Sequence, residues 1–226
     1  DVSISAGNLT INSGGNLIAD NSITVNGLFL ISGTGTYTHA NLADASINIF
    51  NGTESFSPTS TIIVNKWFDY AVPLATNVSG KFGHLIFNTT GSWPQAGLFA
   101  PDRILGDLTV SAGTITLDEG AGMTTNLILN NVNLNGTGRL LINTGPSRDL
   151  NLTTGNFTDV SASTSISSIM YRSVGDLVWT VNGNVQIGHR FSIIEGQSSA
   201  DSGSALINIS GNFAITGGIF DGMKST

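Results

Sequence analysis

Residues Leu105 to Leu117 read LGDLTVSAGTITL, and this stretch contains the repeating unit of the chain. A glycine and a polar residue precede two apolar residues separated by one position, and a small-residue turn and a second alternating run follow. Alternate side chains of a β-strand point to the same face. We therefore expect Leu108 and Val110 to point inward. Asp107 and Thr109 are expected to face solvent.

The same step recurs along the chain, with Gly or another small residue followed by Asn, Asp or Arg and then by the apolar pair. It reads GNLTI from Gly7, GDLTV from Gly106, TNLIL from Thr125, GRLLI from Gly138, GNVQI from Gly183 and GNFAI from Gly211. Short alternating runs repeated in this way are typical of a solenoid. The sequence predicts an all-β fold, a right-handed parallel β-helix (β-solenoid).

The spacing of the steps predicts the size of one rung. Gly7 and Gly27 begin comparable steps, and one coil of three short strands with their turns needs about 20 residues, which gives roughly eleven rungs. We expect Gly113 to turn a corner, because corners favour residues that tolerate positive φ. Stacked rungs are expected to align inward ladders of leucines at positions such as Leu9, Leu28, Leu108, Leu127 and Leu140.

Composition excludes several classes of function. The 226 residues carry a formal net charge of −7 with only eight Lys and Arg, which argues against binding nucleic acid. No apolar run is long enough to span a membrane as a helix. Cysteine is absent, so neither disulfides nor thiolate metal sites contribute.

We interpret residues 1–226 as a single β-helix domain that is a fragment of a longer chain. Two stretches interrupt the regular rungs and are predicted to be loop-rich, residues 65–103 and residues 188–204. Proline is poorly tolerated in central strands, and three of the five prolines lie in 65–103. We expect any specific binding at these interruptions.

Three aromatic residues in the first interruption are candidates for glycan contact, Trp67, Tyr70 and Trp93. An exposed aromatic ring can stack on the apolar face of a sugar. The alternative is that these side chains fill or cover the core, which large aromatic residues do more often.

The sequence gives little support for catalysis. His39, His84 and His189 are far apart and no Ser-based GxSxG motif accompanies them. Asp118 and Glu119 are adjacent, so in a strand they point to opposite faces and cannot act together on one substrate. The protein is therefore predicted not to be an enzyme.

A polysaccharide-degrading β-helix enzyme is the alternative, because such enzymes assemble Asp, Lys or Arg from neighbouring rungs. Its first candidates are Lys81, Asp102 and Arg103. No cofactor is predicted. The sequence contains no Asp-x-Asp-x-Asp loop, although scattered turn oxygens leave Ca²⁺ open.

The run from Phe82 to Gly120 resembles the recurrent unit of large surface proteins of the Bacteroidetes that use type IX secretion, including gliding-motility adhesins. The matching residues are Phe82, Leu85, Phe87 and Asn88 in a first strand, followed by Gly106, Leu108, Val110, Gly113 and Leu117. The chain is more weakly similar to β-helices of the filamentous-haemagglutinin type, whose repeats also read GNLTI.

Both resemblances imply an extended β-helix that is extracellular, at a bacterial cell surface. The predicted function is that of a rigid stalk or display surface in a large secreted adhesin or filament. Its expected partners are other segments of a longer chain, neighbouring surface proteins and glycans. A non-catalytic carbohydrate-binding module remains a third possibility.

Overall fold

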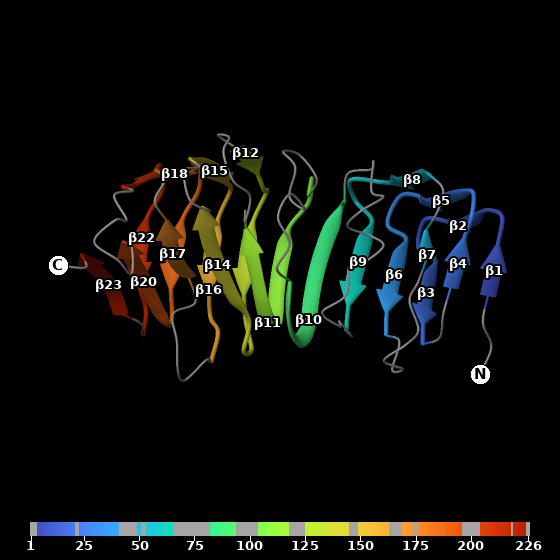
Figure 1. Ribbon diagram of the computed structural model, residues 1–226, viewed down its shortest axis with the longest axis horizontal. Helices are drawn as coiled ribbons and strands as arrows, with labels where there is room; N and C mark the ends of the chain where they lie inside the picture. Colours follow the sequence, from blue (N-terminus) through green and yellow to red (C-terminus); the bar gives the residue numbers. More distant parts are fainter. Residues whose placement is uncertain are drawn as a thin grey trace.

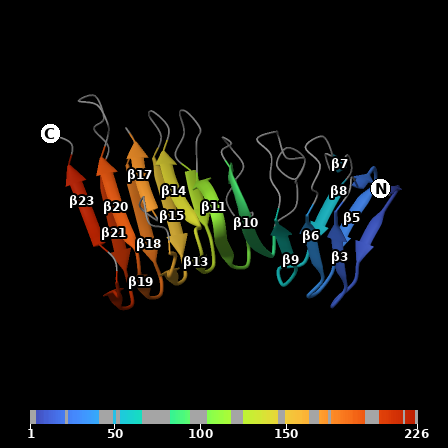
Figure 2. The same ribbon diagram turned by 90° about the horizontal axis from the view of Figure 1, so that it is seen from below.

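The computed structural model describes residues 4–20, 23–40, 49–50, 53–65, 82–93, 104–117, 125–144, 149–162, 169–173, 176–195, 204–217 and 219–224. These residues form short parallel strands, stacked side by side from the N-terminal to the C-terminal end of the molecule (Figures 1 and 2). No helix occurs among them. The predicted fold class, an all-β parallel β-solenoid, is confirmed.

One sheet provides a continuous long face of nine strands. In spatial order these are β3 (Asn16–Ala19), β6 (Thr36–His39), β9 (Thr61–Val64), β10 (His84–Trp93), β11 (Leu108–Leu117), β13 (Val132–Leu134), β16 (Phe157–Asp159), β19 (Val185–Ile187) and β22 (Phe213–Ile215). The sheet branches at the second half of β11, where four more strands stack. These are β14 (Arg139–Thr144), β17 (Ile169–Ser173), β20 (Arg190–Glu195) and β23 (Ile219–Lys224).

Three smaller parallel sheets complete the coils. The first holds β1 (Ile4–Ala6), β4 (Ile23–Val25) and β7 (Ile49–Phe50). The second holds β2 (Leu9–Ile11), β5 (Leu28–Ile31) and β8 (Thr53–Phe56). The third holds β12 (Thr125–Ile128), β15 (Leu150–Thr154), β18 (Leu177–Val181) and β21 (Ala205–Ile209).

The rungs lengthen along the chain. Asn16 pairs with Thr36, which matches the predicted repeat of about 20 residues. Farther along, Val185 pairs with Phe213, a repeat of 28 residues. A uniform rung of 20 residues is therefore too short, and in the described part of the chain the long face holds nine strands, fewer than the eleven rungs expected. Part of this increase lies in longer strands, since β20 and β21 have six and five residues where β4 and β5 have three and four.

The stretch that contains the repeat folds as expected. Leu108 and Val110 are fully buried, while Asp107 and Thr109 are partly exposed. The first half of β11 pairs with β13 and the second half pairs with β14. Gly113 lies between the two halves with a φ of 72°, so it turns the chain from the long face to the branch.

The prediction of a single inward ladder of leucines is wrong in two respects. One of the five leucines is exposed, and the others do not all lie on the same face of the coil. Leu108, Leu127 and Leu140 are buried, but they belong to β11, β12 and β14, which lie in different faces of the coil. Leu28 is 37% exposed, and its neighbour Phe29 pairs with Leu9 and fills the core. Four consecutive apolar residues follow Gly27, and such a run carries no alternation that would distinguish the inward positions.

Strands occupy part of both predicted interruptions. β10 lies within residues 65–103, and β20 lies within residues 188–204. Phe82, Leu85 and Phe87 are buried, and they place this part of the aromatic-rich stretch in the core. Within the two interruptions, residues 66–81, 94–103 and 196–203 lie outside the described residues.

Aromatic side chains pack inside the coil at two places. Phe56 is in contact with the rings of Phe29 and Phe82, at centroid distances of 5.4 and 5.8 Å. Trp179 meets Phe157 edge-on at 5.2 Å and stacks on Phe191 at 6.0 Å. These clusters join successive rungs, since each ring comes from a different coil.

Candidate functional site: the corner ladder and its polar groove

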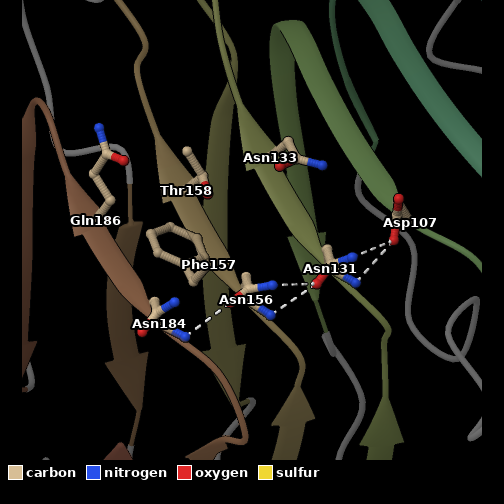
Figure 3. Close-up of a pocket in the computed structure, with 8 residues that line it drawn as sticks. All are labelled: Asp107, Asn131, Asn133, Asn156, Phe157, Thr158, Asn184 and Gln186. Atoms are coloured by element: carbon tan, nitrogen blue, oxygen red, sulfur yellow. Dashed lines mark hydrogen bonds between the residues drawn. The ribbon is translucent and has the colours of Figure 1, made fainter. Parts of the chain in front are cut away.

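Polar side chains form a continuous column at the corner where the chain enters the long face. In each rung from β10 onward, a side-chain atom at this corner accepts a hydrogen bond from the backbone N–H of the equivalent residue in the next rung. Figure 3 shows the part of this column from Asp107 to Asn184. We call this column the corner ladder. Its members are His84, Asp107, Asn131, Asn156, Asn184 and Asn212.

The donor–acceptor distances along the corner ladder are nearly uniform. They are 3.0 Å from Asp107 N to His84 Nδ1, 3.1 Å from Asn131 N to Asp107 Oδ1, and 2.9 Å for each of the three remaining steps. Each side chain therefore satisfies a backbone donor that turns away from the sheet ladder at the corner. The short Asn and Asp side chains suit this role because their oxygen lies close to their own backbone.

Side-chain amides add a second set of bonds between the rungs. Nδ2 of Asn131 donates to Oδ1 of Asp107 at 2.9 Å, and Nδ2 of Asn156 donates to Oδ1 of Asn131 at 3.1 Å. Asn130 also donates to Oδ1 of Asp107 at 2.9 Å. The side chains of Asn131 and Asn156 are thus each held by the rung before them, so that these members of the ladder support one another.

Glycine precedes most members of the ladder because the rungs approach closely there. A Cβ at Gly106 would lie 2.9 Å from the carbonyl oxygen of Gly83 and 2.8 Å from Nδ1 of His84. A Cβ at Gly211 would lie 2.5 Å from the carbonyl oxygen of Gly183. At Gly106 and Gly211 the glycine is therefore required by contact between neighbouring rungs.

A shorter ladder of the same kind precedes the sheet of β15, β18 and β21. Oδ1 of Asp149 accepts the N–H of Asp176 at 2.9 Å. Oδ1 of Asp176 accepts both the N–H and the hydroxyl of Ser204 at 2.8 Å. These two bonds from Ser204, the backbone bond first, lower the pKa of the Asp176 carboxyl, because they favour its charged form.

A polar groove of about 410 Å³ runs beside the corner ladder across three strands of the long face. Its lining residues are Asp107, Asn131, Asn133, Asn156, Phe157, Thr158, Asn184 and Gln186 (Figure 3). Three of them, Asn133, Thr158 and Gln186, occupy the middle positions of β13, β16 and β19 and pair in register. We call these three residues the outer row. They are partly exposed and point away from the core.

The outer row differs from the corner ladder in its hydrogen bonding. The ladder residues hold backbone groups of the next rung, whereas the side chains of Asn133, Thr158 and Gln186 make no hydrogen bond with any described residue. Phe157 lies beneath the groove, but it is only 1% exposed. The groove therefore presents amide and hydroxyl groups and no open aromatic face.

The residues predicted from sequence for glycan contact are not among the described residues that line this groove. Trp67 and Tyr70 lie outside the described residues, and Trp93 ends β10 with a side chain that is likewise outside the description. The candidates for the enzyme alternative, Lys81, Asp102 and Arg103, also lie outside it, as do Asp118 and Glu119.

The three histidines lie apart, with His39 and His84 on strands that are not neighbours and His189 between two strands. His39 ends β6, and burial lowers its pKa because the charged imidazolium would lose its hydration. His84 begins β10 and belongs to the corner ladder. His189 lies between β19 and β20, and its buried Nδ1 has no hydrogen-bond partner among the described residues. Among the described residues, no three His, Asp or Glu side chains gather as metal ligands.

The corner ladder was visible in the sequence only as a recurring small–polar step. Three of the quoted steps, from Gly106, Gly183 and Gly211, lead into the long face, whereas those from Gly7 and Thr125 lead into β2 and β12. The strand alternation predicts only that the polar residue of the step, such as Asp107, faces solvent. Its main role in the corner ladder is instead to cap the next rung.

No family model matches the chain, and comparison with curated proteins and with solved structures likewise gave no match. The described part of the chain contains no helix long and apolar enough to cross a membrane.

Proposed function

We propose that this protein is an extracellular, non-catalytic β-helix that serves as a rigid stalk or display surface in a large bacterial surface adhesin or filament. The corner ladder is the observation that carries the proposal. Its polar side chains, the most regular feature of the surface, hold one rung to the next. A column of side chains that links successive rungs is what a protein with an extended, rigid shape requires.

The outward positions of the long face support a stalk over a polysaccharide-degrading enzyme. A glycosidase of this architecture needs acidic or basic side chains on successive rungs. The middle outward position, followed through the register from β3 to β22, is uncharged in every strand. Its residues are Ile18, Thr38, Ile63, Ile86, Thr109, Asn133, Thr158, Gln186 and Ala214.

The secretion route is proposed from the sequence resemblance. The β10–β11 region that resembles type IX surface proteins of the Bacteroidetes forms adjacent rungs, with Leu85 paired to Leu108 and Phe87 to Val110. The resembling unit is therefore one coil of the solenoid plus its successor. A large adhesin built from such units would gain length with each repeat.

Labelling of intact cells tests the proposal. Antibodies raised against the purified chain should label unpermeabilised cells of the source organism, and external protease should remove the signal. A cytoplasmic protein labelled in parallel should be detected only after permeabilisation. Detection of the chain only in permeabilised cells would contradict a surface location. Release of reducing ends from any polysaccharide by the purified chain would contradict the non-catalytic assignment.

A further inference from the structure

We infer that the polar groove is a binding site for a neutral oligosaccharide, which the outer row of Asn133, Thr158 and Gln186 contacts. This function goes beyond the proposed stalk, which requires no ligand. The three side chains are partly exposed, lie in register on adjacent strands and have no hydrogen-bond partner among the described residues. They are thus available to a ligand, unlike the corner ladder beside them.

The chemistry of the groove indicates a hydroxyl-rich ligand without charge. An amide and a hydroxyl each both donate and accept hydrogen bonds, as sugar hydroxyls do. Among the described lining residues the one charged side chain is that of Asp107, and its Oδ1 already accepts three hydrogen bonds. With a net charge of −7 on the chain, an anionic ligand would be repelled.

The groove does not suit a peptide that adds a strand. Strand addition needs a free sheet edge, whereas β16 is paired with β13 on one side and with β19 on the other. The outer row lies on the face of the sheet, so a ligand meets side chains and not backbone groups. A linear oligosaccharide lying along the solenoid axis would meet one side chain per rung.

The spacing of the rungs sets the length of the ligand. Neighbouring strands are about 4.8 Å apart, so the three side chains of the outer row span roughly 10 Å. That distance exceeds a single sugar ring, and contact with all three residues requires an oligomer. Because Phe157 is buried, no aromatic ring among the described lining residues stacks on the sugar, and their contribution to binding rests on hydrogen bonds. Affinity should be weak, with a dissociation constant on the order of 1 mM.

Titration of the ¹⁵N-labelled chain with cellohexaose, laminarihexaose and mannohexaose tests the inference by NMR. At least one of these neutral sugars should shift the side-chain amide signals of Asn133 and Gln186 in a saturable manner. The hexaose should bind more tightly than the disaccharide of the same linkage. An oligogalacturonate of equal length, which is acidic, should bind more weakly than the neutral sugar.

Substitutions in the outer row should weaken binding without unfolding the protein. The double variant Asn133→Ala/Gln186→Ala is expected to raise the dissociation constant about tenfold. Asn208→Ala is the matched control, because Asn208 is an exposed outward amide on β21, away from the groove. If the double variant does not fold, Thr158→Val removes the central hydroxyl and keeps a residue that favours strands.

Three results would overturn the inference. One is the absence of saturable shifts with all three hexaoses at about ten times the expected dissociation constant. The others are shifts that map away from the outer row, and equal binding by the parent chain and the double variant. Each of them leaves the stalk proposal standing, because cell labelling decides that proposal independently.

Discussion

Nδ1 of His84 accepts the backbone N–H of Asp107 at 3.0 Å, so a histidine fills on β10 the position that Asp or Asn fills on the following rungs. The same nitrogen lies 3.8 Å from Oδ2 of Asp107. A ring nitrogen that accepts a hydrogen bond carries no proton to donate, and the contact is therefore not an ion pair. The corner ladder requires an acceptor of suitable reach, which several residue types provide.

Substitutions of His84 test this requirement. His84→Ala should lower the free energy of unfolding by about 1 kcal/mol, because the N–H of Asp107 loses its acceptor. His84→Asn should recover most of the loss, since asparagine provides the acceptor in the later rungs. Chemical denaturation of the three proteins measures the difference. Equal losses for Ala and Asn would show that the hydrogen bond contributes nothing.

Gly106 and Gly7 begin almost identical sequence steps but differ in their surroundings. A Cβ at Gly106 would lie 2.9 Å from the backbone of Gly83, whereas nothing lies within 4 Å of a Cβ at Gly7. Gly106→Ala should therefore destabilise the protein by about 1–3 kcal/mol through overpacking. Gly7→Ala should be nearly neutral. Thermal unfolding of both variants checks this, and a neutral Gly106→Ala would contradict the close approach of the rungs.

The indole of Trp179 is buried and its Nε1 donates to Oγ1 of Thr154 at 3.1 Å. Thr154→Val keeps the volume but leaves the indole N–H without an acceptor, at a cost of about 1–3 kcal/mol. Trp179→Phe removes the donor and part of the packing. The double variant should lose less free energy of unfolding than the sum of the losses of the two single variants, because both substitutions remove the same hydrogen bond. Strict additivity in urea denaturation would argue against this hydrogen bond.

Burial of His39 makes stability depend on pH. Its pKa is lowered from 6.5 in the folded protein, so the unfolded chain binds the proton more readily. The contribution of the buried, neutral His39 to the free energy of unfolding is complete above pH 6.5. It is lost as the pH falls through the pKa of His39 in the folded protein. Unfolding midpoints measured at about pH 7.5 and about pH 5.5 should differ less for His39→Gln than for the parent. An unchanged difference would assign the pH dependence to other groups.

The local pattern of the sequence was sufficient to predict the coil. In LGDLTVSAGTITL, the alternation around Leu108 and Val110 and the turn at Gly113 depend only on residues close together in the chain, and all three were confirmed. At Leu28 the prediction was wrong, because an unbroken apolar run does not indicate which of its residues point inward. There the backbone N–H of Leu28 donates to Oδ1 of Asn8 at 2.7 Å. This hydrogen bond places Leu28 at the corner and Phe29 in the core.

The polar groove could not be predicted in the same way. Asn133, Thr158 and Gln186 are separated by 25 and 28 residues, and rungs of unequal length prevent a fixed repeat from aligning them. The sequence directed attention to Trp67, Tyr70 and Trp93 because aromatic residues are conspicuous. The residues that meet on one surface are ordinary strand residues whose types carry no signal of a site.

The sequence by itself determined that this protein is a stack of short parallel strands, since a period of two and a recurring small–polar step are properties of neighbouring residues. Only the tertiary structure decided which side of the coil each step occupies. It also decided that Asn and Asp hold the next rung, and that three uncharged side chains form an open row. The physical reason is that caps and grooves depend on contacts between rungs, and the register of those contacts is set by how the turns fold.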